Sequence, residues 1–488
     1  MGAARASDSG DKRIYVDRLT KAFAMFTRRK MLASMGTGLG AVGLASVLAD
    51  ESAAAPAADP LALKAPHFAP RAKRIIHLYM NGGPSQVDTF DHKPALATHK
   101  GQRPSITKDL KTENGTGGMM PSPFRFDRRG ESGLPISELY QETGRFADDM
   151  CVINGMYTDI PNHEPSMFMM NSGHVQAVRP SYGSWLLYGL GTESQNLPGY
   201  VVLCPGLPVN GAANWSNRFL PGVYQGTHMN LPTNFNPKQV IPHLANKQLS
   251  NTSQRRQLDL IQQMNKQHAS RRGGESLLEA RIASLEMAFR MQTAAPEAFA
   301  WQSETETVKS EYYGTDGKMS DFGMNCLLAR RMVERGVRVV QIYYGNSQPW
   351  DTHSNNDGAL RQLCGKTDRP IAALLGDLKR TGLLDETIVL WGGEFGRTPA
   401  SQGNNGRDHN HWGFSVWLAG GGIKGGMTYG ATDEFGFRAV ENRTHPHDLH
   451  ATMLHLMGID HERLTHRYAG RDFRLTDVSG NVIHDIIA

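Results

Sequence analysis

Cysteine is scarce in this chain, and what there is forms no recognisable motif. The 488 residues include 4 cysteines, and none of them, Cys151, Cys204, Cys326 and Cys364, stands in a C-x-x-C pair. The lack of such pairs argues against a zinc knuckle or a thioredoxin-like redox site, and the wide spacing argues against a disulfide framework. We therefore expect small, buried hydrophobic side chains, of which one pair could form a disulfide.

An excess of charge of one sign is also lacking. Lys and Arg number 52 and Asp and Glu 47, for a net charge of +5, and the chain has no basic run of the kind that follows a phosphate backbone. A nucleic-acid partner is therefore not expected. With 39% hydrophobic and 20% charged residues, the composition is that of a globular protein.

Long apolar runs are missing except near the start of the chain. Arg28 and Arg29 precede an uncharged, Gly- and Ala-rich stretch at 31–49, and small residues follow at 52–58. This order predicts a cleaved export signal in residues 1–58, and the arginine pair indicates the bacterial twin-arginine export machinery as a partner. A membrane anchor is the alternative, because the stretch has about the 20 residues that a span needs. We expect a periplasmic or extracellular protein with no stable membrane span after cleavage.

The remainder divides into a Pro- and Ala-rich linker at 59–73 and a single domain at 74–488. Short apolar runs predict strands at 75–80, 200–204, 337–343, 387–391 and 415–419. Helical spacing of apolar residues predicts helices at 253–268, 275–291, 326–335, 369–380 and 447–457. Alternating helices and strands indicate an α/β fold with a mostly parallel central sheet and helices on both faces, and a helical and loop insertion around 205–320.

Acidic and imidazole side chains gather near the ends of the predicted strands, where ligands bind in such sheets. The residues are Asp88, Asp351, His353, Glu394, Asp408, His409 and His411. Carboxylates and imidazoles together suit a divalent metal, whether zinc, calcium, magnesium or manganese. Two readings without a metal stay open: Asp351 could cap a turn, and Glu394 could pair with Arg397 in a structural ion pair.

Several of these stretches resemble one family. The segments 382–391, 413–422 and 447–454 look like the C-terminal half of sulfatases, and 394–396 stands where those enzymes have an Asp-His-Gly metal motif. The segment 82–88 matches an uncharacterised sulfatase-like family, the domain of unknown function 1501, of the alkaline phosphatase/sulfatase superfamily. The chain is identified as a member of that family. The resemblance implies an alkaline phosphatase-like fold and metal-dependent hydrolysis of phosphate or sulfate esters.

The chain departs from the sulfatase pattern where the chemistry is carried. Sulfatases make a formylglycine nucleophile within a C/S-x-P-x-R motif, but the matching segment here has His163 first and Met167 in place of the arginine. The first metal-binding acid of the superfamily falls near Asn81, and the Asp-His pair reads Glu394-Phe395. Formylglycine chemistry is therefore not expected, and a second metal would need Asp88 or His163.

The preferred hypothesis is hydrolysis of an ester of a small molecule or polysaccharide. A metal would be held by Asp351, His353 and His409 or His411, with Glu394 completing the site. Arg397 would bind the anionic ester, because a guanidinium matches its oxygens. Activated water, Ser166 or His163 would be the nucleophile. A catalytically degenerate, metal-stabilised binding or scaffold protein is the alternative, and phosphodiester cleavage or phosphoryl transfer on the same fold is a third reading.

Overall fold

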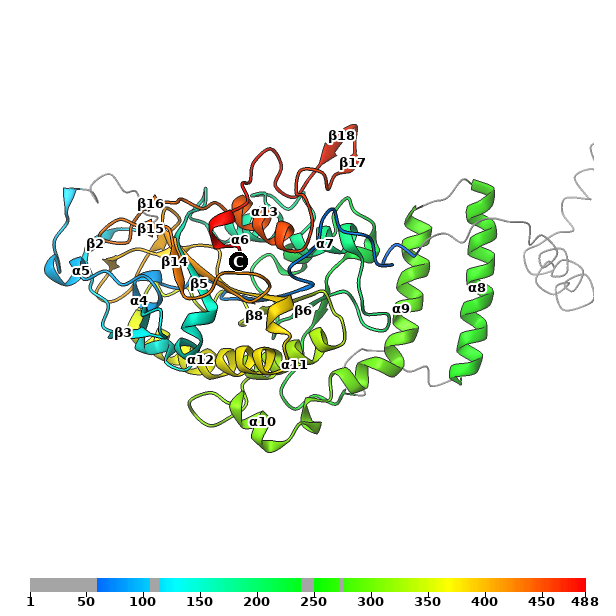
Figure 1. Cartoon of the computed structure of the whole chain (residues 1–488), viewed down its shortest axis with the longest axis horizontal. Coiled ribbons are helices and arrows are strands. Elements are labelled where there is room, and N and C mark those ends of the chain that lie inside the picture. The colour runs from blue at the N-terminus through cyan, green and yellow to red at the C-terminus, as the bar shows by residue number, and fades with distance from the viewer. Residues whose placement is uncertain (1–58, 106–113, 238–249, 273–275) are drawn as a thin grey trace, which may run out of the picture. The chain divides into compact units, whose positions relative to one another are not determined.

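The computed structural model of the chain describes residues 59–105, 114–237, 250–272 and 276–488. The predicted export signal therefore lies outside the described residues. The centre of the described domain is an 8-stranded sheet (Figure 1). Its strands, from one edge to the other, are β14 (Met427–Tyr429), β5 (Met150–Met156), β13 (Phe414–Ala419), β9 (Thr387–Gly392), β1 (Arg74–Tyr79), β8 (Val339–Tyr343), β6 (Tyr200–Leu203) and β7 (Thr227–Met229).

The sheet is mostly parallel. Strand β1 pairs in parallel with both β8 and β9, β6 pairs in parallel with β8 and β7, and β14 pairs in parallel with β5. Strand β13 is the exception, because it runs antiparallel to both of its neighbours, β5 and β9. The central strands are buried along nearly their whole length, which explains why they read as continuous apolar runs in the sequence.

Successive side chains of a strand point to opposite faces of the sheet, and each face has its own hydrophobic core. Ile76 and Leu78 of β1 join the core beneath helices α11 (Asp321–Glu334) and α12 (Asn356–Arg380). Ile75 and Tyr79 join the core beneath α6 (His163–Ser172), α7 (Tyr182–Leu190) and α13 (Pro446–Leu456). Figure 1 shows these two helical layers below and above the sheet.

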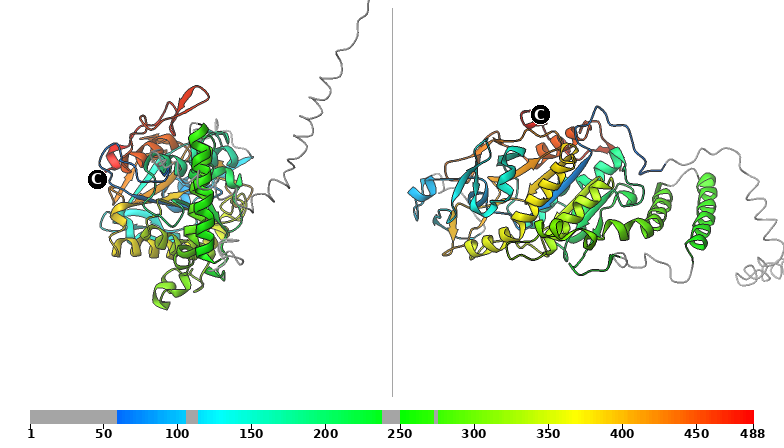
Figure 2. Two further views of the ribbon diagram at one scale, coloured as in Figure 1. Left: turned by 90° about the vertical axis from the view of Figure 1, so that its right-hand side faces the viewer. Right: turned by 60° about the horizontal axis from the view of Figure 1, so that its bottom comes forward.

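The insertion before α11 is helical. It consists of α8 (Asn251–Arg272), α9 (Ser276–Ala298) and the short α10 (Glu306–Glu311). Helices α8 and α9 lie side by side in Figures 1 and 2, and Arg255 Nη1 of α8 donates to Glu286 Oε2 of α9 over 2.8 Å.

Short elements surround the edge of the sheet at which β1, β8 and β9 end. They are α4 (Gln86–Thr89), α5 (Ala95–Thr98) and the strand pairs β2 (Thr116–Met119) with β11 (Ala400–Gln402), β10 (Gly396–Arg397) with β12 (His409–Asn410), β3 (Phe126–Arg129) with β4 (Leu134–Ser137) and β15 (Ala431–Thr432) with β16 (Ala439–Glu441). The hairpin of β17 (His466–Tyr468) and β18 (Arg471–Phe473) lies elsewhere, against Tyr188 of α7 and Phe219. The pairs β2/β11 and β10/β12 carry residues of the site described below.

The expected α/β class with a mostly parallel sheet and helices on both faces is confirmed. Every predicted strand and helix is present, although α12 begins at Asn356 rather than near 369. The four cysteines are buried and free, so the disulfide left open from the sequence does not form. Among the described residues, no helix is both long and apolar enough to cross a membrane.

The segment 59–73, interpreted from sequence as a linker, is attached to the domain by backbone hydrogen bonds. The N–H of Lys64 donates to Leu190 O over 3.1 Å, and the N–H of Arg71 donates to Leu456 O over 2.8 Å. Leu61 and Ala72 are buried. This segment therefore follows the domain surface along two of its helices, α7 and α13.

Candidate metal centre

Five chain segments meet at one edge of the sheet. Strands β1, β8 and β9 end there and lead to Gly82, Asp351 and Glu394, because parallel strands place their carboxyl ends together. Strand β5 also ends there, and its loop leads to His163 at the start of α6. Since β13 runs the other way, the residues that precede it reach the same edge, and these include His409.

Three ligand-type atoms from this edge form a compact triangle. His353 Nε2 lies 3.0 Å from Asp351 Oδ1 and 3.0 Å from His409 Nε2. His409 Nε2 lies 3.3 Å from Asp351 Oδ1. Two imidazole nitrogens and a carboxylate oxygen therefore point at one small volume.

His163 approaches the other oxygen of Asp351. Its Nε2 is 3.5 Å from Asp351 Oδ2, which is too long for a good hydrogen bond, and this buried nitrogen has no hydrogen-bond partner among the described residues. On the opposite side of the ring, Nδ1 lies 2.6 Å from Glu394 Oε1. Burial lowers the pKa of His163, but the carboxylates of Asp351 and Glu394 outweigh it and raise the pKa to about 9.

Glu394 contacts the His163 ring on the side opposite Asp351. It is fully buried, and its Oε1 accepts the N–H of Gly82 over 2.9 Å in addition to its contact with His163. A carboxylate that holds the far nitrogen of an imidazole is a common supporting group of a metal-binding histidine. These contacts favour a supporting role through His163, and the role of Glu394 as a direct ligand stays a prediction, since its Oε2 is buried without a hydrogen-bond partner among the described residues.

Arg397 balances the charge of Asp351. Its guanidinium is fully buried, and Nη2 lies 2.5 Å from Asp351 Oδ1. The remaining guanidinium nitrogens donate to backbone oxygens, including Nε to Gly83 O over 2.9 Å. Burial raises the pKa of Asp351, but His163, His353, His409 and Arg397 together hold that pKa far below its ordinary range. All of these guanidinium contacts are with atoms of the protein itself, so they do not support the expectation that Arg397 binds an ester.

A second group of possible donors shares His409. His353, Asp408 and His409 have donor atoms within 4.8 Å of one another. Asp408 is held by the backbone N–H groups of Asn114, at 2.7 Å, and His409, at 2.8 Å. These bonds occupy the Asp408 carboxylate and fix it beside His353, whose Nδ1 is 3.8 Å away.

Close backbone packing makes the triangle possible. Gly82 has φ +116°, and a Cβ atom there would lie 2.6 Å from the backbone nitrogen of Asp351. Only glycine lets the turn after β1 pass so close to the Asp351 loop. Next to it, Asn81 donates from Nδ2 to the carbonyls of Gly345 and Ser347, which ties the loop after β8 to the same turn.

The spacing of the donor atoms fits a tetrahedral divalent ion. Zinc–nitrogen bonds of about 2.0–2.1 Å place the ligand atoms of a tetrahedron about 3.3 Å apart. The distances among Asp351, His353 and His409 are 3.0 to 3.3 Å, and His163 Nε2 stands 3.5 Å from the second Asp351 oxygen. The unpartnered Nε2 of His163 is the kind of buried atom that a metal ion would satisfy.

Three residues predicted for the site lie outside it. Asp88 is fully buried in a two-point ion pair with Arg407, at 2.7 and 3.1 Å, and also accepts from Ser85 and Asn356. These contacts hold Asp88 in a structural network with Arg407, and its role as a metal ligand stays a prediction. Ser166 donates its hydroxyl to Ile160 O over 2.5 Å and thereby holds the turn that precedes α6.

His411 leaves the cluster because β12 ends at Asn410. The Asn410 amide donates to the carbonyls of Gly413 and Phe437, each over 2.9 Å, which turns the chain away from the edge. His411 then faces Asp159 rather than Asp351, and burial lowers its pKa to about 4. Of the two alternatives, His409 therefore lies in the triangle and His411 does not.

Two supporting residues have no counterpart in the sequence prediction. Gln402 places Oε1 2.5 Å from His353 Nδ1, and Gln348 donates to Asp351 Oδ2 over 3.0 Å. Both are neutral amides in polar turns, so residue type alone does not distinguish them from solvent-facing residues. Knowledge of the pairing between β2 and β11 would have been needed to find Gln402.

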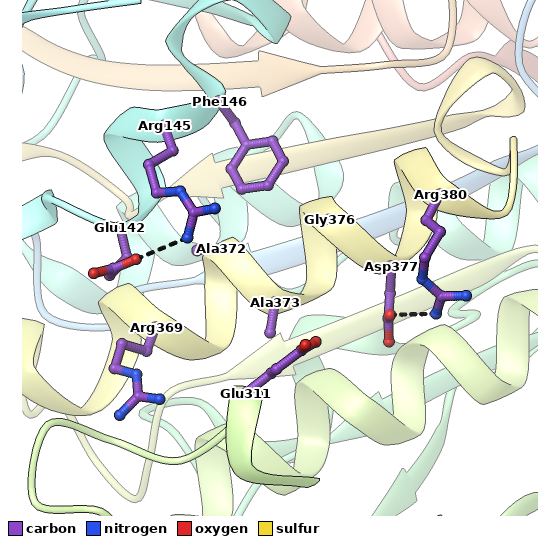
Figure 3. Close-up of a pocket in the computed structure, with 10 residues that line it drawn as sticks. All are labelled: Glu142, Arg145, Phe146, Glu311, Arg369, Ala372, Ala373, Gly376, Asp377 and Arg380. Carbon is purple, nitrogen blue, oxygen red and sulfur yellow. Dashed lines mark hydrogen bonds and ion pairs between the residues drawn. The ribbon is translucent and has the colours of Figure 1, made fainter. Parts of the chain in front are cut away.

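A separate cavity of about 320 Å³ lies between α10, α12 and the 3-10 helix η3 (Thr143–Asp149) (Figure 3). Its floor is formed by the small residues Ala372, Ala373 and Gly376 of α12. Two of the arginines around it are paired with acids, Arg145 with Glu142 at 3.1 Å and Arg380 with Asp377 at 2.6 Å, and the third, Arg369, donates to the carbonyl of Ser310 over 3.2 Å. It contains no imidazole and none of the predicted site residues, so we place the chemistry at the sheet edge.

Residues 72–487 match the family model described as "Protein of unknown function (DUF1501)". The chain belongs to the DUF1501 family. No curated protein matches it by sequence. The family membership predicted from the motifs at 82–88 and beyond is thereby confirmed.

Three solved structures illustrate what this DUF1501 chain is similar to. A lipoteichoic acid synthase from Listeria monocytogenes has 9% identity and a TM-score of 0.36, covering 86% of this chain and 79% of that one. A sulfatase from Pseudoalteromonas sp. has 12% identity and a TM-score of 0.33, covering 80% and 69%. A phosphonate monoester hydrolase from Silicibacter pomeroyi has 12% identity and a TM-score of 0.32, covering 65% and 68%. Similarity at this level carries no information on the substrate of the DUF1501 chain.

Proposed function

We propose that this chain is an exported, metal-dependent hydrolase of phosphate or sulfate esters with an alkaline phosphatase-like fold. The observation that carries the proposal is the triangle of Asp351 Oδ1, His353 Nε2 and His409 Nε2, with edges of 3.0 to 3.3 Å. A catalytic zinc usually has three protein ligands, for example two imidazoles and one carboxylate. Its fourth position is left for water or substrate. Zinc, manganese, magnesium and calcium are all candidates.

His163 would complete the protein part of the site. Glu394 lies at His163 Nδ1 and favours a proton there, so Nε2, on the side of Asp351 Oδ2, is the nitrogen that would give up its proton to a metal ion. A divalent ion there would act as a Lewis acid on an ester oxygen and would activate water. Since His163 is tied to Glu394, we assign it to holding the ion rather than to nucleophilic attack.

The charge of the site favours an anionic ester only once a cation is present. Asp351 is balanced by Arg397, and Asp408 is held by backbone N–H groups, so the protein supplies no uncommitted guanidinium among the residues of the triangle and their contacts. A phosphate or sulfate oxygen would therefore be attracted by the ion rather than by Arg397. This places recognition of the anionic group and activation of water at the same point.

The proposal that the chain is exported rests on its sequence and not on its fold. The arginine pair at 28–29, the apolar stretch and the small residues before 59 are the basis for proposing twin-arginine export to the periplasm or beyond. The twin-arginine route carries folded proteins, which suits an enzyme that acquires its metal before export. An ester of a small molecule or of a polysaccharide outside the cell is the corresponding substrate class.

Two measurements on the purified chain test the proposal. Elemental analysis should find at least one divalent ion per chain, and the double variant His353→Ala, His409→Ala should lose it. Hydrolysis of aryl phosphates and aryl sulfates should depend on that ion and should disappear in the same variant. A chain that binds the ion but turns over neither ester after metals are added back would instead be a metal-stabilised binding protein.

A further inference from the structure

The side chain of Gln402 closes the outer side of His353. Its Oε1 lies 2.5 Å from His353 Nδ1, and on the other side of the ring Nε2 faces Asp351 Oδ1 at 3.0 Å. A neutral imidazole has one N–H donor and one acceptor nitrogen. An oxygen at Nδ1 keeps the proton on that nitrogen and leaves the lone pair on Nε2, directed into the triangle.

The backbone keeps Gln402 at this place. Gln402 is the last residue of β11, where it pairs with Thr116 of β2, and its N–H donates to Gly406 O over 2.8 Å. A Cβ atom on Gly406 would lie 1.8 Å from the carbonyl oxygen of His353. The hairpin formed by residues 400–407 therefore packs directly against the His353 backbone, and only glycine permits that approach.

Further hydrogen bonds join this hairpin to the chain on either side of His353. The N–H of Arg407 donates to Thr352 O over 3.0 Å, and the N–H of Asn356 donates to Asn405 O over 2.9 Å. The N–H of Asn355 donates to Asn405 Oδ1 over 3.0 Å. With both strands of the hairpin attached, the Gln402 amide has a fixed position relative to the imidazole.

We propose that Gln402 is a positioning residue that sets the tautomer and ring orientation of His353 and thereby the metal affinity of the centre. The inference rests on the proposed metal-binding function. Groups that orient a metal-binding imidazole change affinity by about 10- to 100-fold when removed. Gln402 is partly exposed at the surface, so it can be substituted without opening a core cavity.

The test compares variants that remove, keep or withdraw the acceptor oxygen. Gln402→Leu removes the oxygen, Gln402→Glu keeps it at the same side-chain length, and Gln402→Asn withdraws it by one methylene, so that the Leu and Asn side chains have the same length. Zinc affinity is measured on the purified full chain by competition with a chromophoric chelator. Gln402→Leu and Gln402→Asn should bind zinc about 10- to 100-fold more weakly, and Gln402→Glu should bind as tightly as wild type or more tightly.

Two controls separate positioning from general loosening of the hairpin. Asn404→Ala changes an exposed residue of the same hairpin and should leave zinc affinity unchanged. The metal-free thermal midpoint of Gln402→Leu should match that of wild type. Equal zinc affinity of Gln402→Leu and wild type would overturn the inference while leaving the metal site intact, as would equal losses in the Leu and Glu variants. Absence of stoichiometric zinc from wild type would overturn the proposed function and this inference with it.

Discussion

Glu394 Oε1 and His163 Nδ1 are 2.6 Å apart in the interior of the protein, and the same oxygen also takes the N–H of Gly82. One buried carboxylate thus joins the turn after β1, the loop after β9 and the first residue of α6. The orientation of His163 depends on a residue that itself stands outside the donor triangle.

Replacing Glu394 by Gln should weaken metal binding without abolishing it. The amide keeps the shape of the side chain but removes the charge that favours a proton on His163 Nδ1, and we expect about a 10-fold loss of zinc affinity or more. Chelator competition measures the change. Glu311→Gln, at the edge of the separate cavity, is the matched control and should have no effect. Unchanged affinity in Glu394→Gln would contradict the supporting role.

Replacing Arg397 by Met should destabilise the metal-free chain by about 3–5 kcal/mol, because it removes the fully buried guanidinium that pairs with the partly buried Asp351 carboxylate. Added zinc should restore part of this stability, since the ion supplies the missing positive charge. Urea unfolding with and without zinc measures both effects. Arg145→Met breaks a solvent-exposed pair and should cost at most about 1 kcal/mol. A loss that zinc leaves unchanged would argue against the ion binding at Asp351.

Replacing Asp88 by Asn should also cost about 3–5 kcal/mol, because it breaks the fully buried pair with Arg407. In contrast to Arg397→Met, zinc content per folded chain should stay at the wild-type value. Elemental analysis and urea unfolding are the two measurements. Loss of zinc with unchanged stability would return Asp88 to the role of a metal ligand that its position in the sequence suggested.

The metal-free protein should lose stability as the pH falls below about 6.5. Burial lowers the pKa of His77 and of His450 to about 3. Because the folded pKa lies below the unfolded value of 6.5, the stabilisation is complete above pH 6.5 and is lost between pH 6.5 and 3. The slope should reach about 1.4 kcal/mol per pH unit for each group.

Urea unfolding from pH 8 to pH 4 measures this slope. The variant His450→Gln, whose amide can still donate to Met170 O, should show a shallower dependence. Replacement of the exposed His484 should leave the slope as it is. A flat profile in the wild-type chain would show that neither buried imidazole resists protonation.

The sequence predicted the strands that are buried on both faces, because a short continuous apolar run such as 387–391 is typical of a strand covered on both sides. It did not predict β5, where Asn154 and Gly155 interrupt the run, or α6, where Pro165 lies in the first turn. It also placed the start of α12 too late, because the first half of that helix carries many polar side chains.

The sequence predicted the site only in part, because a residue type indicates what a side chain can bind but not where in the fold that side chain points. Asp351, His353 and His409 were predicted as ligands and lie beside one another, whereas Asp88, predicted as a further ligand, and His411, predicted as the alternative to His409, lie outside the triangle. What separates these residues is the pairing of Asp88 with Arg407 and the turn at Asn410, both of which depend on contacts between distant parts of the chain. Glu394 and Arg397 were found, but their partners, and hence their roles, were not.

Strand β13 runs against its neighbours, so the connection from β9 to β13 leaves and rejoins the sheet at the same edge. That single excursion, residues 393–413, carries Glu394, Arg397, Gln402, Asp408 and His409. Its two ends are anchored on adjacent strands. Exchange of this stretch between DUF1501 chains would therefore replace His409 of the triangle together with its neighbours Glu394, Arg397 and Gln402, while Asp351, His353 and His163 would stay with the recipient chain.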